Sequence, residues 1–251
     1  MIIMSQLNKY YRNYFTLDNV TSKSFGVGIS GSGAFKGAER DIEVVHLERN
    51  GDLLFDHGCF HNRSMLYPCF MAGQFKSKFA DFRSFLSAHM DKYYKLTDTY
   101  DSTHFHMARV IGPIDPQPQV RLRAGTFDVQ FDCKPQRYRN DGDTFASAGA
   151  SVTNPTSFPC CPIIRVNQNP GTVVIGGISF TVDAQSGENS FYQYVDIDCE
   201  SMNVFAPDGT PIPYSLHNDT FWMENQKIVI NPGETLTISA NAQIKPRWFD
   251  M

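Results

Sequence analysis

Residues 42–55 read IEVVHLERNGDLLF, two apolar runs joined by Arg49-Asn50-Gly51-Asp52. Asn-Gly between two apolar runs is the strongest short-range signal for a β-hairpin, because both residues tolerate a positive φ. The stretch therefore predicts a long, regular hairpin. Residues 26–33, GVGISGSG, precede it, and this density of glycine predicts a mobile loop.

One segment after the hairpin has the periodicity of a helix. Between Lys76 and Met90, an apolar stripe recurs every three to four positions, formed by Phe79, Phe82, Phe85, Leu86 and His89. Neither Gly nor Pro interrupts it, and alanine and leucine favour helix. We expect about three to four turns here, and no second long helix.

Strand-like stretches fill most of the remaining chain. Residues 126–133 alternate, which places Phe127, Val129, Phe131 and Cys133 on one face of a half-buried strand. The other candidate strands are 93–97, 103–111, 120–122, 163–166, 173–175, 178–182, 192–197, 202–205, 228–230 and 236–240. Many short strands separated by Gly, Pro and Asn turns predict a β-sandwich or jelly roll in the second half.

The domain organisation follows from a change in composition. Residues 137–156 are polar and rich in small side chains, which makes them the best linker candidate. We therefore expect a mainly β chain with a minor α+β character. Residues 1–138 would form an N-terminal domain with one helix and the long hairpin, and residues 139–251 a β-sandwich.

Composition and charge exclude several classes of protein. Of the 251 residues, 41% are hydrophobic and 19% charged, too apolar for a disordered chain. The net charge of −4 argues against binding to nucleic acid through phosphate neutralisation, although DNA could pass a surface that does not hold it. No apolar run approaches the ~20 residues of a membrane span, and residues 1–15 lack the apolar core of a secretory signal.

The cysteines and histidines suggest a metal site only weakly. Without a secretory signal, six cysteines predict reduced and mostly buried thiols. His57, Cys59 and His61 alternate, with Cys69 eight residues further on, and such ligands could hold zinc. The spacing matches no common zinc motif, so surface histidines and a buried thiol are preferred. We expect no metal and no other cofactor.

Two further polar groups have a metal or structural interpretation. Asp196, Asp198 and Glu200 alternate and could bind a hard cation, but no Asx-Gly loop wraps the ion. A polar outer strand face is the preferred interpretation. His104 and His106, near Asp101, are interpreted in the same structural way.

Catalytic motifs are not found in the sequence. There is no Gly-x-Ser-x-Gly, no phosphate loop and no His-Glu-x-x-His, so no catalytic residue is named and no enzyme is expected. Trp222 and Trp248 are the candidates for stacking on a sugar. Trp222, between large apolar neighbours, is expected in the core. Trp248 is expected to anchor the last residues against the body of the protein, with the N-terminal domain as one surface considered.

Three stretches in this order resemble the distal tail proteins of long-tailed siphophages and related prophages. The first is the hairpin 42–55, and the second is YYKLTD at 93–98, leading through ARV at 108–110 to GTFDVQFDCKP at 125–135. The third comprises residues 167–170, VDIDCE at 195–200, NPG at 231–233 and IKPRW at 244–248. Together they cover most of the chain.

The resemblance implies a structural role in the virion. Such proteins form a homo-hexameric ring at the tail tip that joins the tail tube protein to the tail-tip protein, and in many members the outer domains also hold receptor-binding parts. The ring could be single or a back-to-back dodecamer. The resemblance also implies that the N-terminal domain is a β-sandwich with one helix and the long hairpin, and that the C-terminal sandwich is galectin-like. Assembly would take place in the host cytoplasm, with DNA passing the lumen without stable binding and without membrane insertion.

The hairpin is the candidate subunit interface. Its edges are templates for a neighbour's strand, and a closed ring satisfies such head-to-tail contacts. The residues named for this interface are Ile42, Val44, Asn50, Gly51 and Leu53. Two alternatives remain: a carbohydrate-binding host-recognition module without a ring, and a hydrolase directed at the cell wall.

Overall fold

The structure is a computed structural model that describes residues 11–31, 37–48, 50–119, 123–167, 171–182, 193–201, 203–211, 216–217 and 228–251. The chain divides into two compact units, residues 1–137 with Met251, and residues 138–250. The candidate strand 120–122 and Trp222 lie outside the described residues. Within the described ranges, no helix is long and apolar enough to cross a membrane.

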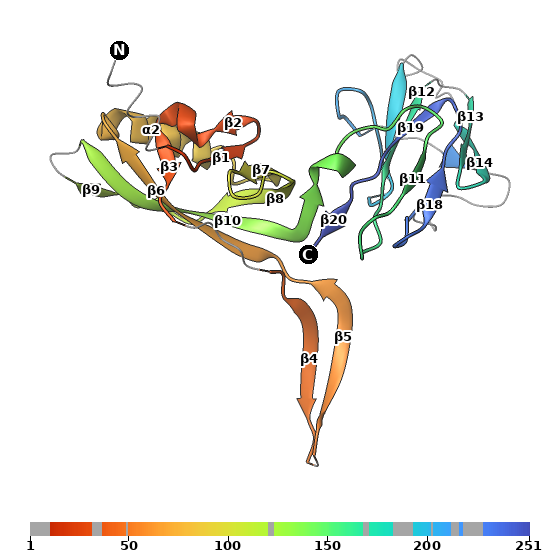
Figure 1. Ribbon diagram of the computed structural model, residues 1–251, viewed down its shortest axis with the longest axis horizontal. Coiled ribbons are helices and arrows are strands. Elements are labelled where there is room, and N and C mark those ends of the chain that lie inside the picture. Colours follow the sequence, from red (N-terminus) through yellow and green to blue (C-terminus); the bar gives the residue numbers. More distant parts are fainter. Residues whose placement is uncertain are drawn as a thin grey trace. The chain divides into compact units, whose positions relative to one another are not determined.

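An antiparallel sheet forms most of the N-terminal unit (Figure 1). Its strand order is β2-β1-β7-β8-β10-β6-β3, and β9 also pairs with β10. The strands are β1 (Phe15–Leu17), β2 (Val20–Thr21), β3 (Val27–Ile29), β6 (Arg63–Ala72), β7 (Tyr94–Asp98), β8 (His104–Ile111), β9 (Gln117–Gln119) and β10 (Ala124–Arg139). A 3-10 turn, η1 (Ser22–Phe25), follows β2.

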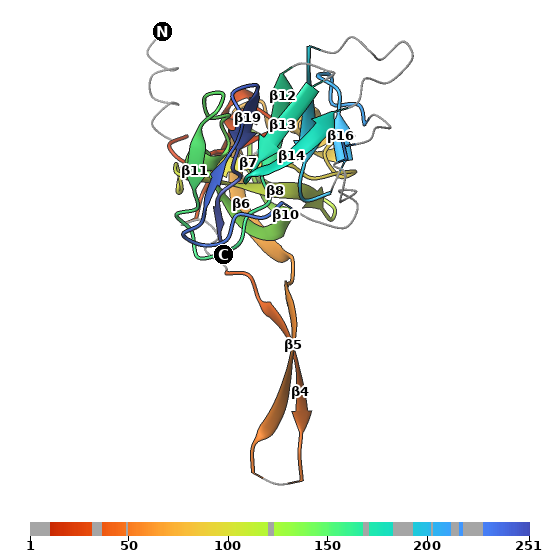
Figure 2. The ribbon, with the colours of Figure 1, turned by 90° about the vertical axis from the view of Figure 1, so that its right-hand side faces the viewer.

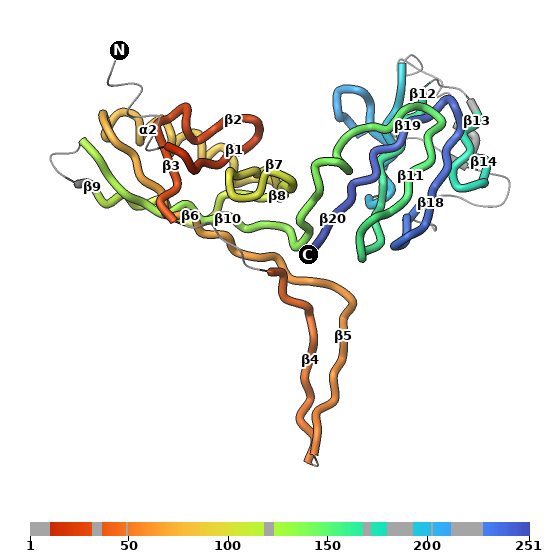
Figure 3. Tube along the Cα trace, in the orientation of Figure 1, coloured from red at the N-terminus to blue at the C-terminus, as the bar shows by residue number. Residues whose placement is uncertain are grey.

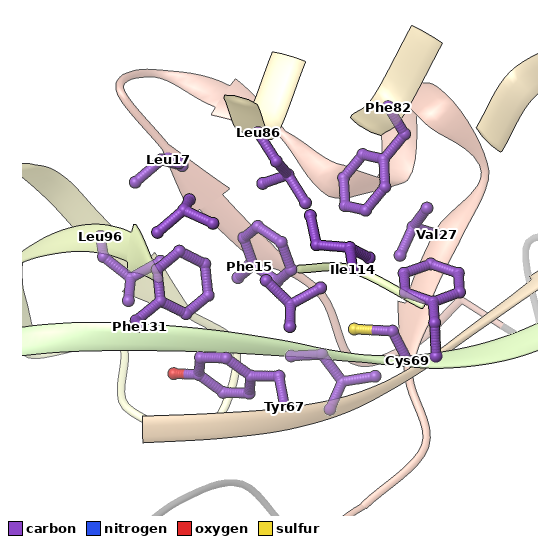
Figure 4. Close-up of a cluster of buried hydrophobic side chains, with 14 of the residues drawn as sticks. Phe15, Leu17, Val27, Tyr67, Cys69, Phe82, Leu86, Leu96, Ile114 and Phe131 are labelled. Atoms are coloured by element: carbon purple, nitrogen blue, oxygen red, sulfur yellow. The ribbon is translucent and has the colours of Figure 1, made fainter. Parts of the chain in front are cut away.

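The helix α2 (Phe75–Ser87) closes the core of this unit. Phe82 and Leu86 on the helix lie close to Phe15 and Phe131 of the strands, and the aromatic rings meet edge-on and tilted (Figure 4). The predicted alternation on 126–133 is confirmed, because its odd-numbered side chains are buried in this core. The predicted helix is also confirmed, although it ends at Ser87 and leaves His89 beyond its last turn.

Residues 27–29 of the glycine-rich stretch before the hairpin form a strand, which corrects the predicted loop at these positions. β3 is buried along its length and pairs with β6. A Cβ on Gly28 would lie 2.8 Å from the ring of Phe70 and 2.9 Å from that of Tyr11. Glycine is needed here because two stacked rings cover the backbone, a packing reason that sequence alone does not separate from flexibility.

The C-terminal unit is a sandwich of short strands around its own core. One sheet has the order β16-β15-β12-β19, a second β13-β14-β17, and β11 pairs with β18. The strands are β11 (Ser151–Thr153), β12 (Ile163–Asn167), β13 (Gly171–Ile175), β14 (Ile178–Val182), β15 (Tyr194–Asp198), β16 (Asn203–Phe205), β17 (Leu216–His217), β18 (Thr235–Thr237), β19 (Ala242–Lys245) and β20 (Phe249–Asp250). The mainly β sandwich architecture is therefore as predicted.

The segment predicted as a linker is folded into this unit, which corrects that prediction. After a 3-10 turn, η2 (Asn140–Gly142), the chain forms β11 against β18. The Arg139 amide donates to the carbonyl of Trp248, and a Cβ on Gly142 would lie 2.4 Å from the Trp248 backbone nitrogen. The small residues thus permit close packing. Trp248 itself is buried in the C-terminal core, as expected for a residue that anchors the end of the chain.

Candidate functional site: an exposed hairpin arm

The predicted hairpin is present, and it extends away from the N-terminal sheet (Figure 2). It consists of β4 (Arg40–His46) and β5 (Asp52–Phe60), and we call residues 40–60 the arm. The last facing pair is His46 and Asp52, so the connection at the tip runs from 47 to 51 and is longer than a two-residue turn. Gly51 has a φ of +99°, a conformation that favours glycine.

The arm is the outer part of an antiparallel pairing that starts in the sheet. Val27 of β3 faces Met71 of β6, and His46 of β4 faces Asp52 of β5. The residue numbers average 49 in both pairs, so the two pairings share one hairpin register. The trace shows β5 leading directly into β6 (Figure 3). The arm is therefore tied to the sheet by one of its longest strands.

Both faces of the arm carry exposed apolar side chains. Val44 and Leu54 face each other on one side, with exposed fractions of 47% and 62%. On the other side, Leu53 faces Val45 and Phe55 faces Glu43, and Leu53 and Phe55 are exposed. The arm is thus a two-stranded ribbon with exposed apolar side chains on both faces, and neither face is covered among the described residues.

The structure places the predicted interface residues along this ribbon. Ile42, Val44 and Leu53 are exposed in the strands, and Asn50 and Gly51 lie exposed at the tip. Sequence reasoning missed Leu47, Leu54 and Phe55, which are equally exposed. The sequence did contain a signal for these residues, because consecutive apolar residues in a strand point to opposite faces. Val44-Val45 and Leu53-Leu54-Phe55 therefore already implied a two-sided apolar hairpin.

A β-bulge distorts the base of the arm. Ile42 faces Asp56 and Arg40 faces Phe60, so Asp41 lies opposite the three residues 57–59, with Gly58 at a φ of +75°. The Arg40 guanidinium pairs with Asp56 at 2.5 Å, and this contact lowers the pKa of the Asp56 carboxyl. A bulge of this kind bends the strand that carries it, here near the base of the arm.

The bulge gathers the predicted metal candidates around one carboxylate. His57, Cys59 and His61 approach Asp41 at 3.6, 3.6 and 3.4 Å. Even so, no group of three or more His, Cys, Asp or Glu in the described part of the chain is arranged to hold a metal ion. Cys69 lies apart, buried in the core of the N-terminal unit.

The other polar candidates have structural partners. Asp196 forms a two-point ion pair with Arg165, and Arg247 pairs with Asp198 and Glu200, which agrees with the preferred interpretation of a polar strand face. In the N-terminal unit, Asp101 binds His104 at 3.1 Å and Arg137 at 2.9 Å. His106 is buried, and burial together with Arg63 and Arg137 lowers its pKa to about 3.

An open cavity of about 380 Å³ lies on the N-terminal unit. Its lining includes the carboxylates of Asp115 and Asp128 and the thiol of Cys69. Burial raises the pKa of that thiol well above its usual range, so it is not an activated nucleophile. Of the two tryptophans considered for stacking on a sugar, Trp248 is buried.

Comparisons with known proteins show that this chain shares its fold with solved phage proteins. No family model and no curated protein matches the chain. A solved structure of the SPP1 Dit (gp 19.1) protein, described as a paradigm of the hub adsorption apparatus in phages that infect Gram-positive bacteria, matches with a TM-score of 0.56 at 13% identity. It covers 92% of this chain and 96% of that one.

Two baseplate structures of phage P2 in the activated conformation agree with this result. The chain solved with Ca matches with a TM-score of 0.58 at 7% identity, over 93% of this chain and 97% of that one. The chain solved with Sr matches with a TM-score of 0.52 at 7% identity, over 92% and 97%. The chain has the fold of phage hub and baseplate proteins along nearly its whole length.

Proposed function

We propose that this protein is a structural subunit of a siphophage tail tip, where six copies form a ring between the tail tube protein and the tail-tip protein. It acts without catalysis. Residues 1–138 form the ring, and residues 139–251 form a galectin-like domain that offers attachment to host-recognition parts. The protein is made in the host cytoplasm and works in the virion. The observation that carries the proposal is the two-sided apolar arm on a hub-type fold.

The arm supports the proposal because it needs a partner on each face. Ile42, Val44 and Leu54 are apolar and exposed on one side, and Leu53 and Phe55 on the other. Contiguous apolar surface of this kind marks an interaction site in soluble proteins. A hairpin that lies on a flat surface would need only one apolar face. Two apolar faces instead suit insertion between layers of protein, as in a ring.

The strand edges of the arm point to the same conclusion. β4 and β5 form a two-stranded sheet, so within the described residues neither outer edge is paired with a further strand. An unpaired edge offers its N–H and C=O groups to a neighbouring strand. A second copy of this chain is the partner of choice, because repeating one such contact around a six-fold axis closes a ring.

The charge is compatible with a passage for DNA. The chain carries 22 basic and 26 acidic residues, and this mild negative charge fits a lumen that repels phosphate. We propose that DNA passes the lumen of the ring without stable binding.

The first test is the absolute mass in solution, by light scattering on a sizing column with negative-stain images of the peak. A ring of six copies, or a double ring of twelve, with a central hole is the expected result. A monomer that stays monomeric when it is mixed with tail tube and tail-tip proteins would contradict the proposal. Glycan binding by that monomer would instead support the carbohydrate-binding alternative.

A second test addresses the arm itself. Gly51→Pro is expected to disrupt the ring, because proline fixes φ near about −65° and Gly51 has a φ of +99°. Gly177→Pro is the matched control, because Gly177 also has a positive φ, +84°, but lies in the C-terminal unit. A Gly51→Pro protein that still forms the ring would contradict the proposal that the arm is the subunit interface.

A further inference from the structure

The tip of the arm combines a reactive sequence with an open conformation. Asn50 is followed by Gly51, and this is the one Asn-Gly pair in the chain. The backbone nitrogen of a residue after asparagine can attack the asparagine side-chain amide, and glycine offers least hindrance because it has no Cβ. Whether the attack occurs in a folded protein depends on how the two residues are held.

We propose that Asn50 is a site of spontaneous deamidation, with the Gly51 nitrogen as nucleophile and water as co-reactant. The Gly51 nitrogen loses its proton and bonds to Asn50 Cγ, and the side-chain nitrogen leaves as ammonia with that proton. Water then opens the cyclic imide. Opening at Cγ yields aspartate, and opening at the main-chain carbonyl yields an isoaspartyl linkage. The net change is an amide and water converted to a carboxylate and ammonium.

The structure leaves both reacting groups accessible. Asn50 and Gly51 are exposed, and they lie beyond the last facing pair of the ladder, His46 and Asp52. Neither the Gly51 amide nor the Asn50 side chain is hydrogen bonded within the described part of the chain. A Cβ on Gly51 would meet nothing within 4 Å, so no neighbour hinders ring closure.

Asn62, at the other end of β5, provides the contrast. Its side-chain nitrogen donates to the Tyr93 hydroxyl at 2.7 Å and to Asp132 at 3.1 Å. The next residue is Arg63, which carries a buried side chain and lies in β6. The amide of Asn62 is thus held in place, and the nitrogen that would attack it belongs to a strand. Asn62 should keep its amide.

The product changes the tip in charge and in length. A carboxylate at position 50 adds to those of Glu48 and Asp52, and the isoaspartyl form also inserts a methylene into the main chain of the turn. If the arm is the subunit interface, as proposed above, the change weakens docking, and a covered tip is protected. Free subunits would then lose competence with age, while assembled subunits keep it.

The test uses the full-length protein and its own internal control. The protein is incubated at mildly alkaline pH, quenched in acid, cut with a lysyl endopeptidase and examined by mass spectrometry. The fragment 37–76 lies between Lys36 and Lys76 and holds two asparagines, Asn50 and Asn62. We expect the mass gain of amide hydrolysis at position 50, in aspartyl and isoaspartyl forms, with Asn62 unchanged. Conversion at both positions at equal rates, or at neither, would overturn the proposal.

Variants separate this proposal from the proposed function. Asn50→Gln is expected to remove the mass gain, because its longer side chain must close a larger ring. Asn50→Asp supplies the charge without the release of ammonia and without the mass gain, and it is expected to weaken the ring. Conversion at Asn50 in a protein that never forms rings would support the modification and contradict the tail-tip role. A ring whose subunits keep Asn50 unmodified even after dissociation would contradict the modification alone.

Discussion

Replacing Val44 and Leu54 together by serine removes two facing apolar side chains from one face of the arm. Complete burial of such a side chain is worth about 1.5–3 kcal/mol. With exposed fractions of 47% and 62%, covering what remains exposed contributes about 2–3 kcal/mol for the pair. The dissociation constant of each subunit contact should therefore rise roughly 30- to 150-fold.

The monomer should be little affected, because exposed substitutions usually change stability by less than about 0.5 kcal/mol. Light scattering over a dilution series measures the assembly, and thermal unfolding measures the fold. Leu66→Ser is the matched control: Leu66 is 46% exposed but lies on β6, outside the arm. The reasoning fails if the double variant assembles like the parent protein, or if Leu66→Ser weakens assembly equally.

Three further predictions concern the two units. Gly142→Ala should lower stability by about 1–3 kcal/mol, as overpacking does, because the new Cβ meets the Trp248 backbone at 2.4 Å; unchanged thermal unfolding would refute this. His106 has a native pKa of about 3 against about 6.5 unfolded, so the unfolded state binds more protons between these values. His106 should then lower stability by up to about 1.4 kcal/mol per pH unit as the pH falls from 6.5 to about 3, and urea unfolding of His106→Leu should show a flatter slope. A thiol reagent should label exposed Cys59 and spare buried Cys69 until the protein unfolds, and equal labelling rates would count against the described burial.

Regular elements could be predicted because their patterns are local. Alternation fixed the buried face of residues 126–133, spacing fixed the helix near 76–90, and Asn50-Gly51 located the arm. Each of these signals acts within a few positions of the chain. The pairing partners were not accessible in the same way, because β1 pairs with β7 across some eighty positions.

The structural role of the small residues was predicted wrongly for one physical reason. Gly28 and Gly142 stand where a ring or a backbone approaches too closely for any Cβ. In the sequence, such a glycine looks like one that confers flexibility, so the stretch 26–33 was predicted as a mobile loop and 137–156 as a linker. The neighbours that exclude a side chain, Phe70 and Trp248, are far away in sequence.

Only part of the candidate interface could be predicted from the sequence, for a related reason. Sequence alone placed Ile42, Val44 and Leu53 in the hairpin but gave no measure of their exposure. An apolar strand residue normally implies a buried face, and the absence of a covering layer is a property of the tertiary fold. Only the structure revealed that both faces of the arm, Leu54 and Phe55 included, are uncovered in the described chain.

The shared register of the arm and the sheet has a mechanical consequence. A load on β5 enters β6 at Arg63, and β6 is held to β10 by ten facing pairs, from Arg63 and Cys133 to Ala72 and Ala124. A force along the strand loads all ten pairs at the same time, so the pairs do not open one after another. Single-molecule stretching from the arm tip to β10 should therefore meet a higher rupture force than pulling the two strands apart sideways. In the role proposed above, this pairing would carry force from the arm into the sheet.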